Sequence, residues 1–281
     1  MYTKDDKMKL EKALGAVEAK LLTTLASQDQ NLFIASEAQG VIGSSREATN
    51  LLLDGLVKKR WLIRLVRGKY LIVPLSAGLE AEHSENWYVI AKSLIEPEPY
   101  YISHSSALDI HEMTVHPSLS VYISSPVRRI PKEILGATFR FVFIQPKDIW
   151  GVEDVWVTSS QKVKVSDLER TIIDCLDRPD LCGGISEIAK GIWAKRNDVE
   201  HSKLVDYAKK LGRKSVVKRL GYLLETYNLG DHETLTGLKA MLTTRSYSLL
   251  DPTLPVSGRY NGVWKLRVNL DLDELKEITK T

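Results

Sequence analysis

The sequence has few cysteines and no long apolar segment. Two of its 281 residues are cysteine, Cys175 and Cys182, and neither their spacing nor their neighbours suggest a zinc site. Apolar runs such as residues 139–144 are too short to cross a bilayer, and the charged N-terminus lacks the apolar region of a signal peptide. We therefore predict a cytoplasmic protein that has no membrane partner. A disulfide is conceivable, but we expect two free thiols in a reducing compartment.

The sequence also lacks the local motifs of common catalytic sites. It contains no P-loop, no HExxH and no GxSxG. His104, His111 and His116 lie near two acidic residues, but spacings of seven and five do not place three imidazoles on one helical face. Helix caps and surface positions explain these histidines better than a metal site. We therefore predict that the protein is not an enzyme and binds neither a metal ion nor a cofactor.

Positive charge is unevenly distributed along the chain. The net charge of +3 is too small to indicate a nucleic-acid partner by itself. Residues 44–70, however, contain seven basic and two acidic residues, and residues 209–219 contain six basic residues and no acidic one. The remainder of the chain is net acidic. Such concentration of positive charge in two places is typical of surfaces that contact a polyanion.

Three helices are predicted near the N-terminus. Apolar residues at helical spacing predict the first over residues 10–26, and a short extended link leads to a second over residues 35–39. Gly43 then offers the positive φ that a sharp turn between helices needs. Ser44 and Glu47 have the spacing of a capping box, so the third helix is predicted to open at Ser44.

A β-hairpin is predicted directly after the third helix. Residues 61–66 and 69–73 are β-type runs on either side of Arg67 and Gly68. The order of helix, short helix, turn, capped helix and basic hairpin is typical of a winged helix-turn-helix. We predict this DNA-binding domain over residues 1–75.

The third predicted helix carries polar side chains suited to base recognition. Arg46 could bond guanine and Asn50 adenine in the major groove, while basic residues of the hairpin would contact phosphates or the adjacent minor groove. The helix would turn inward a face comprising Ala48, Leu51, Leu52, Gly55 and Leu56. The predicted DNA contacts are Ser44, Ser45, Arg46, Thr49, Asn50, Lys58, Lys59, Arg64, Arg67 and Lys69. Winged helices also serve as protein-interaction modules, and that alternative stays open.

A second domain is predicted over residues 86–281, after a linker of small and acidic residues at 76–85. It would have a strand-rich part at 98–165, a helical part at 166–245 and an extended tail at 246–281. The predicted strands are residues 119–124, 139–144 and a pair around a turn at 159–161, and the predicted helices are residues 87–95, 103–113, 166–176, 185–195, 201–211, 214–227 and 233–242. The predicted fold class is therefore α+β, with a winged helix-turn-helix followed by a mixed α/β domain that ends in a helical region.

Two charged features of this second domain have alternative interpretations. Arg170 and Asp174 are one helical turn apart, and we expect a structural pair that holds the strand region to the helices rather than a catalytic one. The basic run at 209–219 is either a solvated face or an accessory nucleic-acid contact, because its positive charges repel one another without a polyanion. The residues of that accessory contact would be Lys209, Lys210, Arg213, Lys214, Lys218 and Arg219.

Three further segments resemble the AbiEi family, the antitoxins of type IV abortive-infection toxin–antitoxin systems. They are Ser-His-Ser-Ser-Ala-Leu at 103–108, Val-Ser-Asp-Leu-Glu-Arg-Thr-Ile-Ile-Asp at 165–174 and Val-Lys-Arg-Leu-Gly-Tyr-Leu-Leu-Glu at 217–225. Together with the predicted winged helix, the resemblance covers nearly the whole chain. The segments look like the structural signature of the family's second domain, and the family implies no catalytic residue among them.

The resemblance implies a regulator with two activities. The winged helix would repress its own operon by binding inverted repeats in the double-stranded DNA of the promoter, as a monomer or a dimer. The second domain would counteract a cognate nucleotidyltransferase-like toxin, without needing a stable complex with it. From the residues alone, two other classes stay open: a DNA-processing enzyme that the winged helix targets to DNA, and a protein-interaction module.

Overall fold

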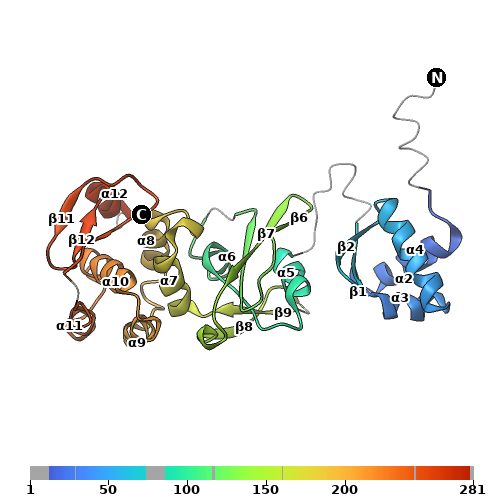
Figure 1. The fold of residues 1–281 in the computed structure, drawn as a ribbon, viewed down its shortest axis with the longest axis horizontal. Coiled ribbons are helices and arrows are strands. Elements are labelled where there is room, and N and C mark those ends of the chain that lie inside the picture. The colour runs from blue at the N-terminus through green and yellow to red at the C-terminus, as the bar shows by residue number, and fades with distance from the viewer. Residues whose placement is uncertain are drawn as a thin grey trace, which may run out of the picture. The chain divides into compact units, whose positions relative to one another are not determined.

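The chain forms two compact units, Met1–Asn86 and Trp87–Thr281 (Figure 1). This computed structural model describes residues 13–28, 30–73, 86–115, 118–159, 161–243 and 245–278. The predicted linker at 76–85 and the predicted start of the first helix at 10–12 lie outside these ranges. Both units combine helices with strands, so the fold class is mixed α+β. None of the described helices combines the length and apolar character needed to cross a bilayer.

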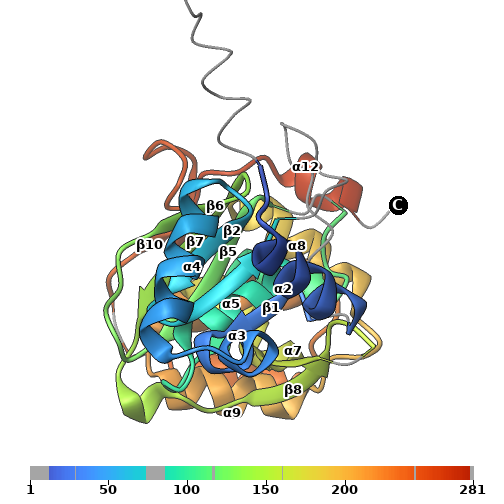
Figure 2. The same ribbon diagram turned by 90° about the vertical axis from the view of Figure 1, so that its right-hand side faces the viewer.

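The described part of the first unit consists of three helices and a three-stranded antiparallel sheet (Figure 2). Its elements are α2 (Ala16–Ser27), β1 (Leu32–Ile34), α3 (Ala35–Ile42), α4 (Arg46–Lys58), β2 (Leu62–Val66) and β3 (Lys69–Ile72). The strand order is β1-β3-β2. α3 is longer than predicted and ends at Gly43, whose φ of 70° is the left-handed conformation expected of a glycine there.

The core of the first unit lies between the helices and the sheet. Leu21 and Leu25 of α2 and Leu53 and Leu56 of α4 are completely buried. Two aromatic rings from the neighbouring strands β1 and β3, Phe33 and Tyr70, stack with their centroids 5.8 Å apart. The buried apolar residues recur at the helical spacing from which this helix was predicted. α2 nevertheless begins at Ala16, so the prediction is wrong for residues 13–15, which are not helical.

The second unit is built around a six-stranded mixed sheet with strand order β6-β7-β5-β4-β9-β8. β5 and β7 are parallel, as are β4 and β9, and the other neighbours are antiparallel. The sheet elements are β4 (Tyr101–Ile102), β5 (Ser120–Ser125), β6 (Lys132–Ile134), β7 (Ala137–Phe143), β8 (Val152–Trp156) and β9 (Lys162–Ser166). The strands predicted at 119–124, 139–144 and around 159–161 correspond to β5, β7 and the β8–β9 hairpin.

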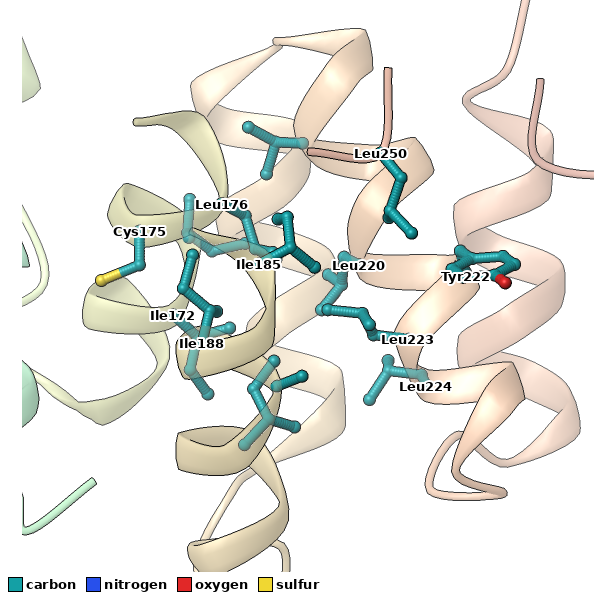
Figure 3. Packing of buried hydrophobic residues seen from close by; sticks show 14 of the residues in the cluster. Ile172, Cys175, Leu176, Ile185, Ile188, Leu220, Tyr222, Leu223, Leu224 and Leu250 are labelled. Carbon is teal, nitrogen blue, oxygen red and sulfur yellow. The ribbon is translucent and has the colours of Figure 1, made fainter. Parts of the chain in front are cut away.

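Helices pack against this sheet and against one another. Side chains of α7, α8 and α10, such as Ile172, Ile188 and Leu220, point toward one another in a large apolar cluster (Figure 3). Cys175 and Cys182 are buried beside this cluster as free thiols, which confirms the expected absence of a disulfide between them. The helices are α5 (Trp87–Ile95), α6 (His104–Ile110), α7 (Leu168–Asp177), α8 (Ile185–Ala194), α9 (His201–Leu211), α10 (Lys214–Thr226) and α11 (His232–Ala240), with short 3-10 turns η2 (Pro146–Asp148) and η3 (Pro179–Leu181).

The predicted extended tail is wrong. Residues 246–278 form a second small sheet, order β10-β12-β11, and a final helix. Trp264, Leu266 and Leu275 are completely buried in the apolar cluster. The segment folds onto the helices because this burial removes the three apolar side chains from water. The elements are β10 (Ser248–Leu249), β11 (Arg259–Asn261), β12 (Leu266–Val268) and α12 (Leu272–Glu277).

Candidate nucleic-acid interface

The helix predicted to read DNA begins one residue later than expected. Ser45, not Ser44, is the N-cap of α4, and its side chain accepts a hydrogen bond from the backbone N–H of Ala48 at 3.2 Å. The Ser44 hydroxyl instead lies 2.9 Å from Thr49 Oγ1. Ser45 is exposed and Ser44 is half-buried, so both still border the start of the helix.

The buried face of α4 also differs from the predicted one. Thr49, Leu53 and Leu56 form the inward stripe of α4, whereas Leu51, predicted to face inward, is 74% exposed. Thr49 is 1% exposed, and its hydroxyl donates to the Ser45 carbonyl at 2.9 Å. Its predicted role as a DNA contact is therefore wrong, because the side chain faces the core and its hydroxyl is already bonded.

Arg46 and Asn50 line one hollow on the first unit. Its volume is about 320 Å³, and both residues are exposed on the first turns of α4. The hollow also contains Ser36 and Gln39 of α3, which were not predicted as site residues. These two polar residues are three apart on the short helix before the turn, a spacing that places them on one face and could have identified them. The lining residues are Ile34, Ala35, Ser36, Gln39, Arg46, Thr49, Asn50 and Gly68.

The turn of the β2–β3 hairpin lies at the edge of the same hollow. Gly68 has a φ of 78°, and its carbonyl accepts a hydrogen bond from the backbone N–H of Ala35 at 2.9 Å. This bond fixes the hairpin turn to the first residue of α3. Arg67 is exposed in the turn, and Lys69 follows it half-buried at the start of β3. The structure thus brings the hairpin turn and the N-terminal residues of α4 to one concave surface.

The other predicted DNA contacts of the first unit lie away from this hollow or are paired with acidic side chains. Lys58 is exposed at the far end of α4, about 18 Å from Arg46 at the usual rise per residue. Lys59 pairs with Glu18 of α2 at 2.8 Å. Burial would raise the pKa of Glu18, but the hydrogen bonds from Lys59 and from the Gly15 N–H outweigh it and lower this pKa. Arg64 is exposed on β2 and lies 3.5 Å from Asp54 of α4.

The basic run at 209–219 does not form a continuous free surface. Lys218 and Arg219 are 1% and 5% exposed, so their predicted contact with nucleic acid is wrong. Lys218 Nζ donates to the Ser246 carbonyl at 2.7 Å, and Arg219 donates to the carbonyls of Leu176 and Leu250. These cations are buried because they satisfy backbone carbonyls between packed elements.

The remaining four residues of that run are exposed but have different surroundings. Arg213 forms an ion pair with Asp177 at 2.6 Å, and Lys214 Nζ donates to the Met241 carbonyl. Lys210 lies 4.7 Å from the centre of the Trp150 ring. Lys209 is exposed at the end of α9. These partners within the protein reduce the repulsion among the positive charges at 209–219. That repulsion was the reason to expect a polyanion there.

Arg170 is the centre of a buried polar network. Its Nε donates to Asp174 Oδ1 at 2.7 Å and its Nη2 to the Tyr101 hydroxyl at 2.9 Å, and that hydroxyl donates to Asp174 Oδ2 at 3.0 Å. The guanidinium also stacks over Trp150 at 3.6 Å. Burial would lower the pKa of Arg170, but Asp174 and Tyr101 more than offset it and raise this pKa. The expected i, i+4 pair that joins the strand region to the helices is confirmed.

His104 is buried, contrary to the expectation of a surface position. It is 3% exposed, and its Nδ1 lies 2.8 Å from Ser103 Oγ, which accepts a hydrogen bond from Ser124. Burial, reinforced by the charge of Arg178, lowers the pKa of His104 to about 3. His111 contacts the Ser166 carbonyl at 2.7 Å, and His116 lies outside the described residues. Within the described ranges, no group of three or more His, Cys, Asp or Glu side chains is placed to hold a metal ion.

The fold resembles that of a solved protein of distant sequence. The crystal structure of the RV2827C protein from Mycobacterium tuberculosis matches with a TM-score of 0.69 over 96% of this chain and 97% of that chain. The sequence identity is 15%, so the likeness concerns the fold of both units and nothing further. No protein-family model and no curated protein matches the chain.

Proposed function

We propose that the first unit is a winged helix-turn-helix that binds double-stranded DNA and represses the operon encoding it. The observation that supports this proposal is the convergence of Arg46, Asn50 and the Gly68 turn on one hollow. The element order of three helices followed by a hairpin, with β1 completing the sheet, supports this assignment. α4 is then the recognition helix and the β2–β3 hairpin is the wing.

The exposed chemistry of this surface suits a duplex. A helix fits the major groove, where an arginine can bond guanine O6 and N7 and an asparagine can bond adenine N6 and N7. Arg67 in the hairpin turn would reach phosphates or the neighbouring minor groove and set the register of the helix. Ser36 and Gln39 join the proposed contacts, and Thr49 is removed from them.

Replacing Arg46 and Asn50 by alanine should weaken and broaden binding to the promoter fragment. Each substitution should cost about 1–3 kcal/mol of binding free energy and relax the preference for one base. The measurement is a fluorescence-anisotropy titration of the operator duplex and of single-base variants at several salt concentrations. Lys58→Ala provides a matched control, because this exposed cation lies at the opposite end of α4 and should change affinity less than Arg46→Ala does.

Unchanged affinity and base preference in both Arg46→Ala and Asn50→Ala would refute the assignment of α4 as recognition helix. Cleavage or modification of the operator in the presence of a divalent metal would instead favour a DNA-processing enzyme. We propose that the protein is not an enzyme and needs no cofactor, so the duplex should be recovered intact from these incubations.

We further propose that the second unit is the antitoxin part of a type IV system, as the resemblance to the AbiEi family implies. A gene next to this one should then encode a nucleotidyltransferase-like toxin, and co-expression of the two in the cytoplasm should restore growth that the toxin alone arrests. The Arg46→Ala/Asn50→Ala variant, expressed from a foreign promoter, should rescue growth as well as the natural sequence does. Failure of the natural sequence to rescue growth would reject the antitoxin activity without affecting the DNA-binding proposal.

A further inference from the structure

The small C-terminal sheet of the second unit presents two exposed tyrosines. Tyr247 and Tyr260 are 44% and 64% exposed, and their rings meet edge to face with centroids 4.9 Å apart. Tyr260 lies on β11, whereas Tyr247 directly precedes β10, and β12 runs between these strands. Large exposed aromatic rings are unusual on a surface that contacts only water.

Two cations lie beside this pair of rings. The register pairs Tyr260 with Arg267 across β11 and β12, and the Arg267 guanidinium lies 5.5 Å from the Tyr260 ring centre. Lys265 Nζ lies 5.7 Å from the centre of the Tyr247 ring. Arg245 is exposed two residues before Tyr247 in the sequence. We call these five residues the tyrosine platform; its members are Arg245, Tyr247, Tyr260, Lys265 and Arg267.

The platform carries no balancing negative charge of its own. Between residues 243 and 270 the sequence contains one acidic residue, Asp251, and it is 2% exposed. None of the three platform cations forms an ion pair with a carboxylate in the part of the chain that the structure describes. The Nε atom of Arg267 is buried and has no hydrogen-bond partner there. A polyanion would supply the missing charge.

Two buried cations of the basic run at 209–219, Lys218 and Arg219, hold the backbone that carries this surface. Lys218 Nζ donates to the Ser246 carbonyl and to Ser248 Oγ at 3.1 Å, so it holds the residues on both sides of Tyr247. Arg219 donates to the carbonyls of Leu249 and Leu250 on the same strand segment. The position of the Tyr247 backbone is therefore set by α10.

A tryptophan anchors the other side of the platform. Trp264 precedes Lys265, is completely buried, and donates from Nε1 to Glu225 Oε2 at 2.6 Å. Its ring lies so close to Gly221 of α10 that a Cβ there would come within 2.0 Å of Trp264 Cζ3. The glycine is needed for this close approach. The platform thus rests on a fixed base rather than on a loose loop.

We propose that the tyrosine platform binds single-stranded nucleic acid. Bases would stack on the exposed faces of Tyr247 and Tyr260 while Arg245, Lys265 and Arg267 contact the phosphates. A duplex fits this surface poorly, because its base faces are already stacked on one another. The proposal does not rest on the proposed function of the first unit, which concerns double-stranded DNA.

The test is binding of labelled oligo(dT) and oligo(U) of about ten nucleotides to the full chain, with an abasic strand of equal length. The natural protein should bind both base-containing strands more tightly than the abasic strand, and the two arms distinguish DNA from RNA. Tyr247→Ala/Tyr260→Ala should lose at least about 30-fold in affinity for the base-containing strands and bind them no better than the abasic one. Arg267→Gln should reduce the slope of log affinity against log salt by about 0.7.

Two controls keep the test specific. Trp156→Ala removes another exposed aromatic side chain, 60% exposed and 4.6 Å from Lys162 Nζ, and should leave binding unchanged. Arg46→Ala/Asn50→Ala should also leave single-strand binding unchanged, while the tyrosine variant should bind the operator duplex normally. Equal affinity of the natural protein and the double tyrosine variant would overturn the proposal, as would equal binding of base-containing and abasic strands by the natural protein.

Discussion

Replacing Arg170 with leucine should lower the free energy of unfolding of the second unit by about 3–5 kcal/mol, because it leaves a buried carboxylate without its cation. Arg170 and Asp174 are 2% and 6% exposed, and the guanidinium also serves the Tyr101 hydroxyl and the Asp148 carbonyl. Leucine retains apolar bulk but supplies no donor to any of these oxygens. Urea unfolding at neutral pH can be followed by tryptophan fluorescence, since five of the six tryptophans belong to the second unit.

Two comparison variants distinguish the contribution of this buried network to stability from that of an exposed ion pair. Arg178→Ala removes a surface pair with Asp180, whose side chains are 44% and 47% exposed, and should cost no more than about 1 kcal/mol. Arg170→Leu/Asp174→Leu removes both buried charges and should recover part of the lost stability. If Arg170→Leu were as stable as Arg178→Ala, the network would not hold the strand region to the helices.

His104 should make a contribution to the stability of the second unit that falls as the pH is lowered below about 6.5. Burial, with the charge of Arg178 second, lowers the pKa of this imidazole in the folded protein to about 3 from an ordinary value of 6.5. Between these two values the unfolded chain binds a proton that the folded protein does not. One such proton reduces the unfolding free energy by about 1.4 kcal/mol per pH unit, and no reduction from His104 remains above about pH 6.5.

The variant His104→Asn isolates this contribution. His104 has a φ of 54°, a conformation that asparagine tolerates better than most residues, so the backbone need not change. For each protein, the free energy of unfolding is compared between neutral pH and about pH 4.5, roughly two units below the ordinary pKa of histidine. Over this range the natural protein should lose about 2–3 kcal/mol more than the variant does. Burial raises the pKa of Asp174 to about 6, with the opposite sign for stability, and the comparison cancels this contribution. Parallel stability curves, or an NMR titration of His104 near its ordinary pKa, would contradict the prediction.

The positions of the helices were predictable because they depend on local patterns. α9 covers the predicted residues, and α8 and α10 end one residue earlier than predicted. The helices predicted to begin at Ser44 and Ser166 both have their N-cap one residue later, and for one physical reason. Each serine hydroxyl bonds a threonine five residues later, Thr49 at 2.9 Å and Thr171 at 2.7 Å, and the next residue caps the helix. A capping-box spacing does not distinguish between two neighbouring residues that can both accept the bond.

The candidate DNA-binding surface was partly predictable. Arg46 and Asn50 were identified from their place near the start of a helix, and the hairpin turn from Gly68. Thr49 was misplaced because threonine fits a polar face by type, and only packing against Leu53 and Leu56 places it in the core. Ser36 and Gln39 share one face of α3 by their spacing, but only the angle between α3 and α4 places that face beside Arg46.

Periodicity and turn chemistry determined where this chain forms helices and hairpins, and composition determined that charge gathers in two segments. The tertiary structure alone decided which charges are free. Lys218 and Arg219 are buried and donate to backbone carbonyls, while Lys265 and Arg267 of the predicted tail lie half-buried beside exposed tyrosines. The reason is that exposure depends on which elements pack together, and pairs such as Lys218 with Ser246 or Gly221 with Trp264 join residues far apart in the chain, where no local pattern can report them.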